Sequence, residues 1–389
     1  MTYDLDPGQS PVKVAILSPL PSGPDEPPES GVAGYTAALI EYLNVPVTVL
    51  AQKGALTGAP GLATIAPLWE PNLSLPIRVW RAVGRIAPDI LHVQHEFNLY
   101  GGLPQGMFLT AILLWLRKRG LKTVTTVHGV VPLNAVSAEF LLRNSLPGPV
   151  SFVRHAFRLS YRAIEAASDL LIVHHDYFRH VLIDDYGIDP ARVNVIQPGS
   201  REVAYDATTV PKQVGKSVLC LGFLTGYKLP ELLVEVAESD AMPDALFTFC
   251  VGINPRIRTR QYRDRADSLE RRVRALGPRA VWRGYVPDEA LAATIQSADV
   301  IVLPYTECVS VSAVAALARQ WRVPLCYSRA LRPLFGPGRL EFELNSGALS
   351  AAILSALSGV PNAIDSMFIA WRDAAAATTN AWSKLLASS

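Results

Sequence analysis

Short apolar runs alternate with longer amphipathic stretches along almost the whole chain, and this alternation restricts the fold more than any other feature. The short runs fit strands, whereas the stretches between them have apolar residues at helical spacing. Repeated strand–helix units build parallel sheets that are covered by helices on both faces. The sequence therefore predicts an α/β protein.

The strand–helix units form two series. The first predicts a doubly wound domain over residues 1–199, with strands in residues 12–18, 46–51, 89–97, 122–129, 169–175 and 192–200. Residues 200–215 lack strong periodicity and are interpreted as a linker. The second series predicts another doubly wound domain over residues 216–370, with strands in residues 216–224, 245–252, 280–286, 299–305 and 323–328. Two Rossmann-like domains predict a ligand cleft where the carboxyl ends of their strands meet.

Composition narrows the class of protein further. Half of the residues are hydrophobic, 18% are charged, and the net charge is +2. This excludes a disordered chain and gives no argument for nucleic-acid binding. The polar residues 1–13 are not expected to be a signal peptide, and the apolar run 108–116 is shorter than the ~20 residues of a membrane span. The four cysteines lack metal-ligand spacing and are interpreted as reduced core thiols of a cytoplasmic protein: Cys220, Cys250, Cys308 and Cys326.

Two basic clusters and one apolar helix leave alternatives open. Residues 117–119 and the five arginines between Arg256 and Arg265 form either solvated helix faces or contacts to an anionic partner. Residues 103–120 are interpreted as a helix that packs on the first sheet. Peripheral contact with a membrane and a lipid acceptor is the less favoured alternative for this helix.

The segment from Asp299 to Ala318 has the first candidate chemistry. A buried strand ends at Tyr305, and Glu307 follows in a short loop where it could accept hydrogen bonds from substrate hydroxyls. Ser310 and Ser312 stand where the next helix begins, so either could donate to a ligand. The alternative is helix capping without a ligand.

A second loop, from Leu219 to Val236, has a lysine at a similar place. A strand ends at Gly222, and Thr225 and Lys228 follow before the next helix. A lysine at the head of such a loop can bind a phosphate as a point charge, and glycine lets the backbone approach closely. Taken alone, Lys228 could equally be a surface lysine.

Together the two loops resemble the donor-binding domain of retaining glycosyltransferases of family 4, which have the GT-B fold. Lys228 matches the lysine that grips the nucleotide diphosphate in that family, and Glu307 aligns with the first Glu of its Glu-x7-Glu motif. Residues 283–305 match the segment before that motif. The resemblance covers nearly the whole chain. It implies metal-independent, retaining transfer from a nucleotide-sugar donor, and a C-terminal helix in residues 371–389 that crosses back to the first domain.

Three departures from the family pattern indicate an atypical branch. Ala315 replaces the second Glu, which commonly holds the ribose, and residues 309–312 replace a glycine-rich turn. Phe223 stands where a phosphate-binding arginine is expected. The alternative function is therefore a non-catalytic, glycosyltransferase-like subunit that binds a partner or a glycan.

The first half of the chain supplies further candidates. His128 ends a predicted strand and resembles the family's histidine near the donor sugar and the reaction centre, although a strand-end histidine can be purely structural. Glu96, His95 and Asn98 could face the acceptor or stabilise their own loop. Gly34 lies near the start of the first predicted helix, where a phosphate or a sugar could approach the backbone.

Other polar pairs are interpreted as structural. The histidine pair at residues 174–175 suggests metal binding, but no third ligand stands at a supporting spacing, and the pair at residues 184–185 lies in a helix that is expected to end at Gly187. The predicted catalytic residues are His128, Lys228 and Glu307, and no metal site is predicted. The predicted donor site comprises Gly34, Gly222, Thr225, Lys228, Tyr305, Glu307, Ser310, Val311 and Ser312.

Overall fold

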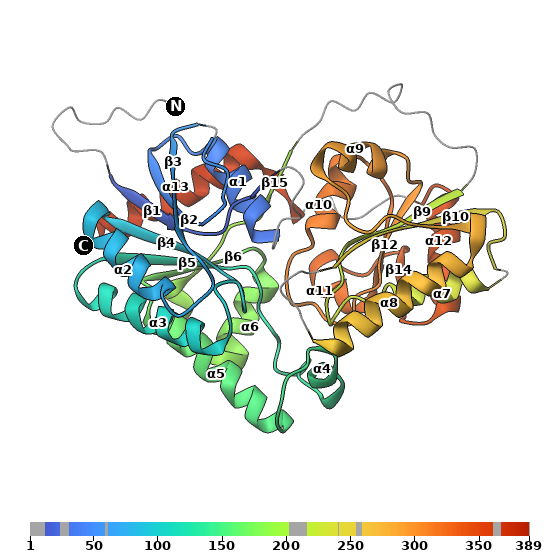
Figure 1. Ribbon diagram of the computed structural model, residues 1–389, viewed down its shortest axis with the longest axis horizontal. Helices are drawn as coiled ribbons and strands as arrows, with labels where there is room; N and C mark the ends of the chain where they lie inside the picture. Colours follow the sequence, from blue (N-terminus) through green and yellow to red (C-terminus); the bar gives the residue numbers. More distant parts are fainter. Residues whose placement is uncertain are drawn as a thin grey trace.

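The computed structural model describes residues 12–23, 31–58, 61–201, 216–239, 241–253, 259–360 and 367–388. Two domains lie side by side, and each has a parallel sheet between layers of helices (Figure 1). The predicted α/β class with two doubly wound, Rossmann-like domains is confirmed. No helix in the described part of the chain is long and apolar enough to cross a membrane.

The first domain contains a seven-stranded parallel sheet in the order β3-β2-β1-β4-β5-β6-β7. The direction of winding reverses between β1 and β4, which creates the switch point of a doubly wound sheet. The strands are β1 (Val14–Leu17), β2 (Val47–Gln52), β3 (Ala63–Trp69), β4 (Ile90–His95), β5 (Lys122–Val127), β6 (Leu170–Val173) and β7 (Val193–Val195).

Alternating side chains of this sheet pack on different helices, as the pleat of a strand requires. Val14 and Ile16 belong to an apolar cluster with α1 (Gly31–Tyr42) and α13 (Trp371–Ala387). Ala15 and Leu17 pack with α2 and α3 on the opposite face. The helices of that second face and the adjoining segment are α2 (Leu75–Ile86), α3 (Leu103–Lys118), α4 (Ala138–Arg143), α5 (Val150–Ala166) and α6 (Asp176–Tyr186).

The C-terminal helix returns to the first domain. The short strands β8 (Gly199–Ser200) and β15 (Ile369–Ala370) pair in parallel, and α13 begins directly after β15. Trp382 of α13 is buried in the cluster that contains Val14. The C-terminal end of the chain therefore packs on the first domain after passing through the second. Residues 202–215 of the predicted linker lie outside the described residues.

The second domain contains a six-stranded parallel sheet in the order β11-β10-β9-β12-β13-β14. Its strands are β9 (Lys216–Phe223), β10 (Ala245–Gly252), β11 (Ala280–Trp282), β12 (Val300–Leu303), β13 (Leu325–Ser328) and β14 (Glu341–Phe342). Its helices are α7 (Glu231–Glu238), α8 (Arg260–Ala275), α9 (Asp288–Gln296), α10 (Ala313–Gln320), α11 (Arg332–Phe335) and α12 (Ser346–Leu357). Single 3-10 turns occur at Pro190–Arg192, Gly277–Arg279 and Arg329–Leu331.

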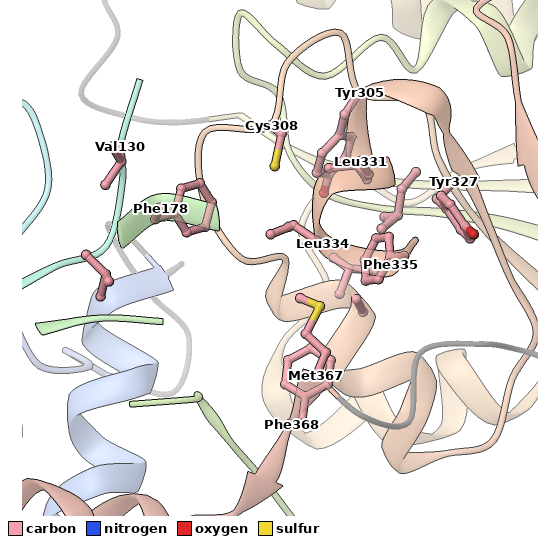
Figure 2. Close-up of a cluster of buried hydrophobic side chains, with 14 of the residues drawn as sticks. Val130, Phe178, Tyr305, Cys308, Tyr327, Leu331, Leu334, Phe335, Met367 and Phe368 are labelled. Carbon is pink, nitrogen blue, oxygen red and sulfur yellow. The ribbon is translucent and has the colours of Figure 1, made fainter. Parts of the chain in front are cut away.

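An apolar cluster connects the two domains. Figure 2 shows Val130 and Phe178 of the first domain near Cys308 of the second, with Leu334 and Met367 deeper in the same cluster. The Val130 amide also donates a hydrogen bond to the Val309 carbonyl oxygen at 2.7 Å. The loops after β5 and β12 therefore meet at the domain junction.

Each strand predicted from the sequence has a counterpart, although residues 192–200 form two short strands, β7 and β8, instead of one, and β3, β14 and β15 were not predicted. Strand β3 lies at the sheet edge, contains Pro67 and is only partly buried, so its apolar signal is weak. The interpretation of residues 103–120 as a packed helix is confirmed for one side only. Helix α3 buries Leu109, Leu113 and Leu116, whereas Met107 is 65% exposed.

Candidate functional site

Loops from both domains meet at the carboxyl ends of β5 and β12. Gly129 and Ser310 form an isolated antiparallel bridge across the domain junction. His128 precedes this bridge on one side, and Glu307 lies in the loop on the other side. The fold thus brings two of the three predicted catalytic residues, His128 and Glu307, to the same junction.

Lys228 lies at the carboxyl end of β9, in the loop that the sequence predicted. Its ammonium nitrogen is 3.0 Å from the place that a Cβ atom on Gly222 would occupy, and Gly222 has a φ of +124°. The same nitrogen lies 5.4 Å from the centre of the Tyr305 ring, within cation–π range. Glycine at position 222 therefore leaves the space in which the lysine head stands.

Backbone hydrogen bonds join the two loops of the second domain into one unit. The Leu229 amide donates to the Pro304 carbonyl oxygen at 2.8 Å, and the Thr306 amide donates to the Tyr227 carbonyl oxygen at 2.8 Å. The Tyr227 hydroxyl is hydrogen-bonded to the Ser310 side chain. Movement of one loop would therefore move the other.

Arg265 stabilises the loop around Lys228. Its guanidinium donates to the carbonyl oxygens of Thr225 at 2.9 Å and Lys228 at 2.7 Å, and it forms a bidentate ion pair with Glu231. From the sequence, the arginine cluster at residues 256–265 could form either a solvated helix face or a contact to an anionic partner. Arg265 instead supports the backbone, and Arg256 and Arg258 lie outside the described residues.

A small pocket lies beside Lys228 at the carboxyl ends of β9 and β12. It is lined by Gly222, Phe223, Lys228, Pro304 and Tyr305, among others. The Phe223 ring stacks on Tyr285 with centroids 6.2 Å apart. In the adjoining loop the Thr225 hydroxyl is buried without a hydrogen-bond partner. The pocket thus combines a cation with aromatic faces, both of which a phosphorylated nucleoside could use, whereas the Thr225 hydroxyl lies buried outside its lining.

Glu307 has a partner that the sequence did not suggest. Arg143, at the end of α4 in the first domain, forms an ion pair with one carboxylate oxygen of Glu307. The Thr306 hydroxyl donates to the other oxygen at 2.5 Å. A Cβ atom on Gly226 would lie 2.5 Å from the Asn144 side-chain oxygen, so the end of α4 sits directly against the Lys228 loop. A substrate hydroxyl would have to share Glu307 with Arg143 or displace it.

His128 belongs to a buried chain of polar side chains. His174 Nδ1 lies 2.9 Å from the Ile196 carbonyl oxygen, which can only accept, so Nδ1 has the proton. His174 Nε2 then accepts from His128 Nδ1 at 3.3 Å. His128 Nε2 lies 2.7 Å from the Gln94 side-chain oxygen Oε1, so a proton on His128 Nδ1 requires the amide to be turned until its NH₂ group faces the ring. Both ring nitrogens of His128 are therefore engaged within the protein.

Burial keeps these histidines neutral. It lowers the pKa of His92 to about 3, where the nearby His174 adds to the effect, and it lowers the pKa of His174 to about 4. Burial also lowers the pKa of His128 well below its ordinary value, and the neighbouring histidines lower it further. A donor sugar could contact His128 Nε2 only in place of Gln94.

This histidine chain predicts a loss of stability in mild acid. The unfolded chain binds protons near the ordinary pKa of 6.5, whereas folded His92 and His174 remain neutral to about 3 and 4. The unfolding free energy should therefore fall as pH drops from 6.5 to 4, by about 1.4 kcal/mol per pH unit for each histidine. Urea titrations across this range measure the slope. His92→Gln should flatten it, the exposed His180→Gln should not, and an unchanged slope in His92→Gln would contradict the assignment.

Glu96 lies in the loop after β4, with its Cγ 4.0 Å from the Cβ position of Gly129, and the charge of Lys228 acts on it from the other domain. Burial raises the pKa of the Glu96 carboxyl, and the positive charge of Lys228 opposes this rise. His95 Nδ1 is buried without a hydrogen-bond partner, and burial lowers the His95 pKa to about 4. Asn98 is exposed in the same loop with a φ of 65°. The predicted acceptor residues Glu96 and His95 therefore lie near the donor loops, whereas Asn98 is at the surface.

Of the remaining predicted donor residues, Ser312 and Val311 lie at the domain junction, whereas Gly34 lies at the surface of α1. Ser312 caps α10 by accepting from the Ala315 amide, and its hydroxyl lies 3.3 Å from the Tyr305 hydroxyl. Val311 is partly buried between the bridge at Ser310 and this cap. Gly34 lies exposed within α1, and no atom is within 4 Å of the place of a Cβ. Ala315 is fully buried, so the first turn of α10 leaves no open place for the second carboxylate of the family motif.

The other polar pairs have structural partners. His175 caps α6 by accepting from the Tyr177 amide, and Asp185 accepts from the Leu133 amide at 2.7 Å. Helix α6 ends at Gly187, as predicted. All four cysteines are buried and form no disulfide. Within the described ranges, no group of three or more His, Cys, Asp or Glu side chains could hold a metal ion.

Comparisons with known proteins agree with this geometry. Residues 30–200 match the family model described as Glycosyltransferase Family 4. Sucrose-phosphate synthase from Thermosynechococcus elongatus is similar over 97% of this chain and 100% of its own, with a TM-score of 0.73 and 17% identity. The fold is GT-B.

Other structures with this GT-B arrangement contain uridine nucleotides. Anabaena HepE in complex with UDP and glucose has a TM-score of 0.65 at 13% identity, over 96% of this chain and 100% of its own. A structure described as trehalose-6-phosphate from E. coli bound with UDP-2-fluoro glucose has a TM-score of 0.62 at 14% identity, over 96% of both chains. No curated protein matches the sequence significantly. The findings support a GT-B glycosyltransferase.

Proposed function

We propose that this protein is a retaining, metal-independent glycosyltransferase of the cytoplasm. It moves a sugar from a nucleotide-sugar donor to a hydroxyl or amine of a small-molecule or glycan acceptor. The observation that supports this most directly is the position of Lys228. Its ammonium group lines the pocket at the carboxyl end of β9, and its positive charge acts on Glu96 of the other domain.

The charges fit the chemistry of glycosyl transfer. A nucleoside diphosphate gains negative charge as it leaves the sugar, and a fixed cation stabilises that charge. Lys228 supplies this cation, and the N-terminus of α10 adds a partial positive charge nearby. In a retaining reaction on one face of the sugar, the leaving phosphate oxygen takes the proton of the acceptor. This explains why a pair of catalytic carboxylates is not required.

Glu96 and Glu307 have different roles in this proposal. Glu96 lies on the acceptor side and orients the attacking hydroxyl. Its carboxyl group is buried, which raises its pKa, so a hydrogen bond to the acceptor would satisfy it. Glu307 binds donor-sugar hydroxyls after its ion pair with Arg143 opens or rearranges. The pair joins the two domains, so donor binding would be coupled to their relative position.

A non-catalytic, glycosyltransferase-like subunit is the second candidate. Two observations favour it. Glu307, the first Glu of the family motif, is already paired with Arg143, and Ala315, at the position of the second Glu, is buried, so neither position is open to a ligand. Such a subunit would bind a partner protein or a glycan without turning over a donor.

A panel of UDP-, GDP-, dTDP- and ADP-sugars separates the two functions. We expect one donor to raise the unfolding temperature and to be slowly hydrolysed in the absence of an acceptor. At 100 times its Kd, a donor should add about 2.7 kcal/mol to the unfolding free energy. UDP-sugars come first because similar structures contain UDP. Binding with slow hydrolysis would favour the enzyme, whereas absence of binding at millimolar concentrations would refute the donor site and favour the subunit.

A further inference from the structure

The outer side of α2 and α3 exposes large apolar side chains that no other part of the described chain covers. Met107 is 65% exposed and Leu103 is 67% exposed, whereas Trp80 and Trp115 are each 41% exposed. We call this surface the α2–α3 face and define it by Leu73, Ile77, Trp80, Leu103, Met107 and Trp115. Both helices lie on the same side of the first sheet (Figure 1).

Helix α3 is apolar around its whole circumference for most of its length. It buries Leu109 and Leu113 on the sheet, yet the opposite side contains Met107 and Trp115 instead of charges. Residues 103–116 contain no charged residue at all. A helix on the surface of a water-soluble domain normally has a polar outer face, so this side is built for contact with something apolar.

The two tryptophans join the helices into one surface. Trp80 of α2 and Trp115 of α3 meet edge to face, with ring centroids 6.2 Å apart. The Arg119 guanidinium lies 4.7 Å from the Trp115 ring centre. Tryptophan combines an apolar body with a polar N–H group and is enriched where lipid meets water.

The charged residues of α2 and α3 themselves are all basic, although Glu70, Asp89 and Glu96 stand just outside the two segments. Residues 71–88 contain three arginines, residues 97–122 contain four basic residues, and neither range contains Asp or Glu. The whole chain has 36 basic and 34 acidic residues, so these segments depart strongly from the average. Arg117 is paired with Asp169, but Arg81, Arg85 and Lys118 extend into solvent.

We propose that the α2–α3 face docks on an anionic lipid bilayer. The apolar side chains would enter the interfacial region, and the basic side chains at the C-terminal ends of the helices would contact lipid phosphates. An apolar surface on helices whose charged residues are all basic fits a negatively charged membrane better than a protein partner, which would present its own mixture of charges. This inference is independent of the proposed transferase activity.

The direction of the helices places this surface beside the candidate site. Helix α3 follows β4, so its exposed residues Leu103 and Met107 lie near the sheet edge that also holds Glu96. The basic residues Lys118 and Arg119 lie at the opposite end of the helix. A docked bilayer would therefore have its apolar contacts at the acceptor side of the cleft.

Vesicle flotation tests the proposal with the full chain. We expect the protein to float with phosphatidylcholine vesicles that contain phosphatidylglycerol, and to bind much less to phosphatidylcholine alone or at high salt. Leu103→Ser with Met107→Ser should lower the partition coefficient about tenfold, because two exposed apolar contacts are lost. Leu344→Ser with Leu354→Ser removes two exposed leucines from the second domain and should bind as wild type does.

A charge variant and a spectroscopic probe complete the test. Arg81→Gln with Arg85→Gln should weaken binding to the anionic vesicles, whereas Arg260→Gln with Arg339→Gln should not. Brominated lipids should quench tryptophan fluorescence, and Trp80→Phe with Trp115→Phe should remove most of that quenching. Thermal unfolding checks that each variant is folded. Absence of wild-type binding, or equal binding by the Leu103/Met107 variant and its control, would overturn the proposal. Self-association through this face without vesicle binding would assign it to a protein contact instead.

Discussion

Replacing Lys228 with alanine is expected to lower turnover about 100-fold with the donor that the protein uses, since one fixed cation at a developing charge contributes on that scale. The Lys228 head has a defined place, 3.0 Å from the Cβ position of Gly222 and near the Tyr305 ring. Solvent cannot supply an equally oriented cation there. The loss should appear mainly in kcat, because the charge on the diphosphate grows as the sugar leaves.

Lys216→Ala is the matched control for this experiment. Lys216 is an exposed lysine on the same strand, β9, but it lies at the opposite end from the pocket. Both variants lose one positive charge, so any general effect on solubility or net charge should be shared. Steady-state kinetics and thermal unfolding of both variants would separate chemistry from folding. Near wild-type turnover by Lys228→Ala would remove Lys228 from the site.

The tight space around Lys228 adds a second expectation to the same series. Lys228→Arg keeps the charge, but a planar guanidinium is larger than an ammonium group and demands a different geometry. The Cβ position of Gly222 and the Tyr305 ring leave little room for it. Recovery of full activity by arginine would mean that the charge acts from the surface and not from this enclosed place.

The sequence predicted the features that depend on short-range signals. Apolar runs of strand length identified both sheets, and the place of Lys228 followed from a strand end, a glycine and a helix start within ten residues. The strand ends of a parallel sheet share one edge, and for this reason the loops of Lys228 and Glu307 could be placed together from the amino-acid sequence alone.

The features that escaped prediction depend on pairs far apart in the sequence. Arg143 and Glu307 are separated by 164 positions, and neither helix α4 nor its loop has a pattern that indicates the contact. The polar chain through His92, His128 and His174 likewise forms only when three strands pack side by side. Periodicity shows that a face is buried, but it does not show which buried polar groups will meet.

The sequence also could not predict which side of an apolar helix is exposed to solvent. A uniformly apolar helix such as α3 reads as a core helix, since periodicity cannot distinguish two buried sides from one buried and one exposed side. Only the sheet and the neighbouring helix α2 determine which side remains open.

Gly199→Ala is expected to destabilise the junction between the first domain and helix α13. A Cβ atom at this position would lie 2.1 Å from the Trp371 ring, far closer than any van der Waals contact. Trp371 begins α13, and its ring packs against Tyr35, which in turn contacts His128. The ring cannot shift without disturbing this aromatic group, so the unfolding free energy should fall by about 3 kcal/mol.

Two further variants show whether the ring is the cause. Gly106→Ala adds the same methyl group inside α3, where nothing lies within 4 Å, and it should leave stability unchanged or raise it by up to ~1 kcal/mol. Gly199→Ala combined with Trp371→Ala should cost less than the sum of the two single changes, because the second change removes the clash created by the first. Urea unfolding of the wild type, the two single variants at Gly199 and Trp371 and the double variant gives the coupling energy directly. Strict additivity would mean that the backbone near Gly199 shifts to make room for the methyl group while the Trp371 ring stays in place. In that case, this ring does not connect α13 to the histidine chain.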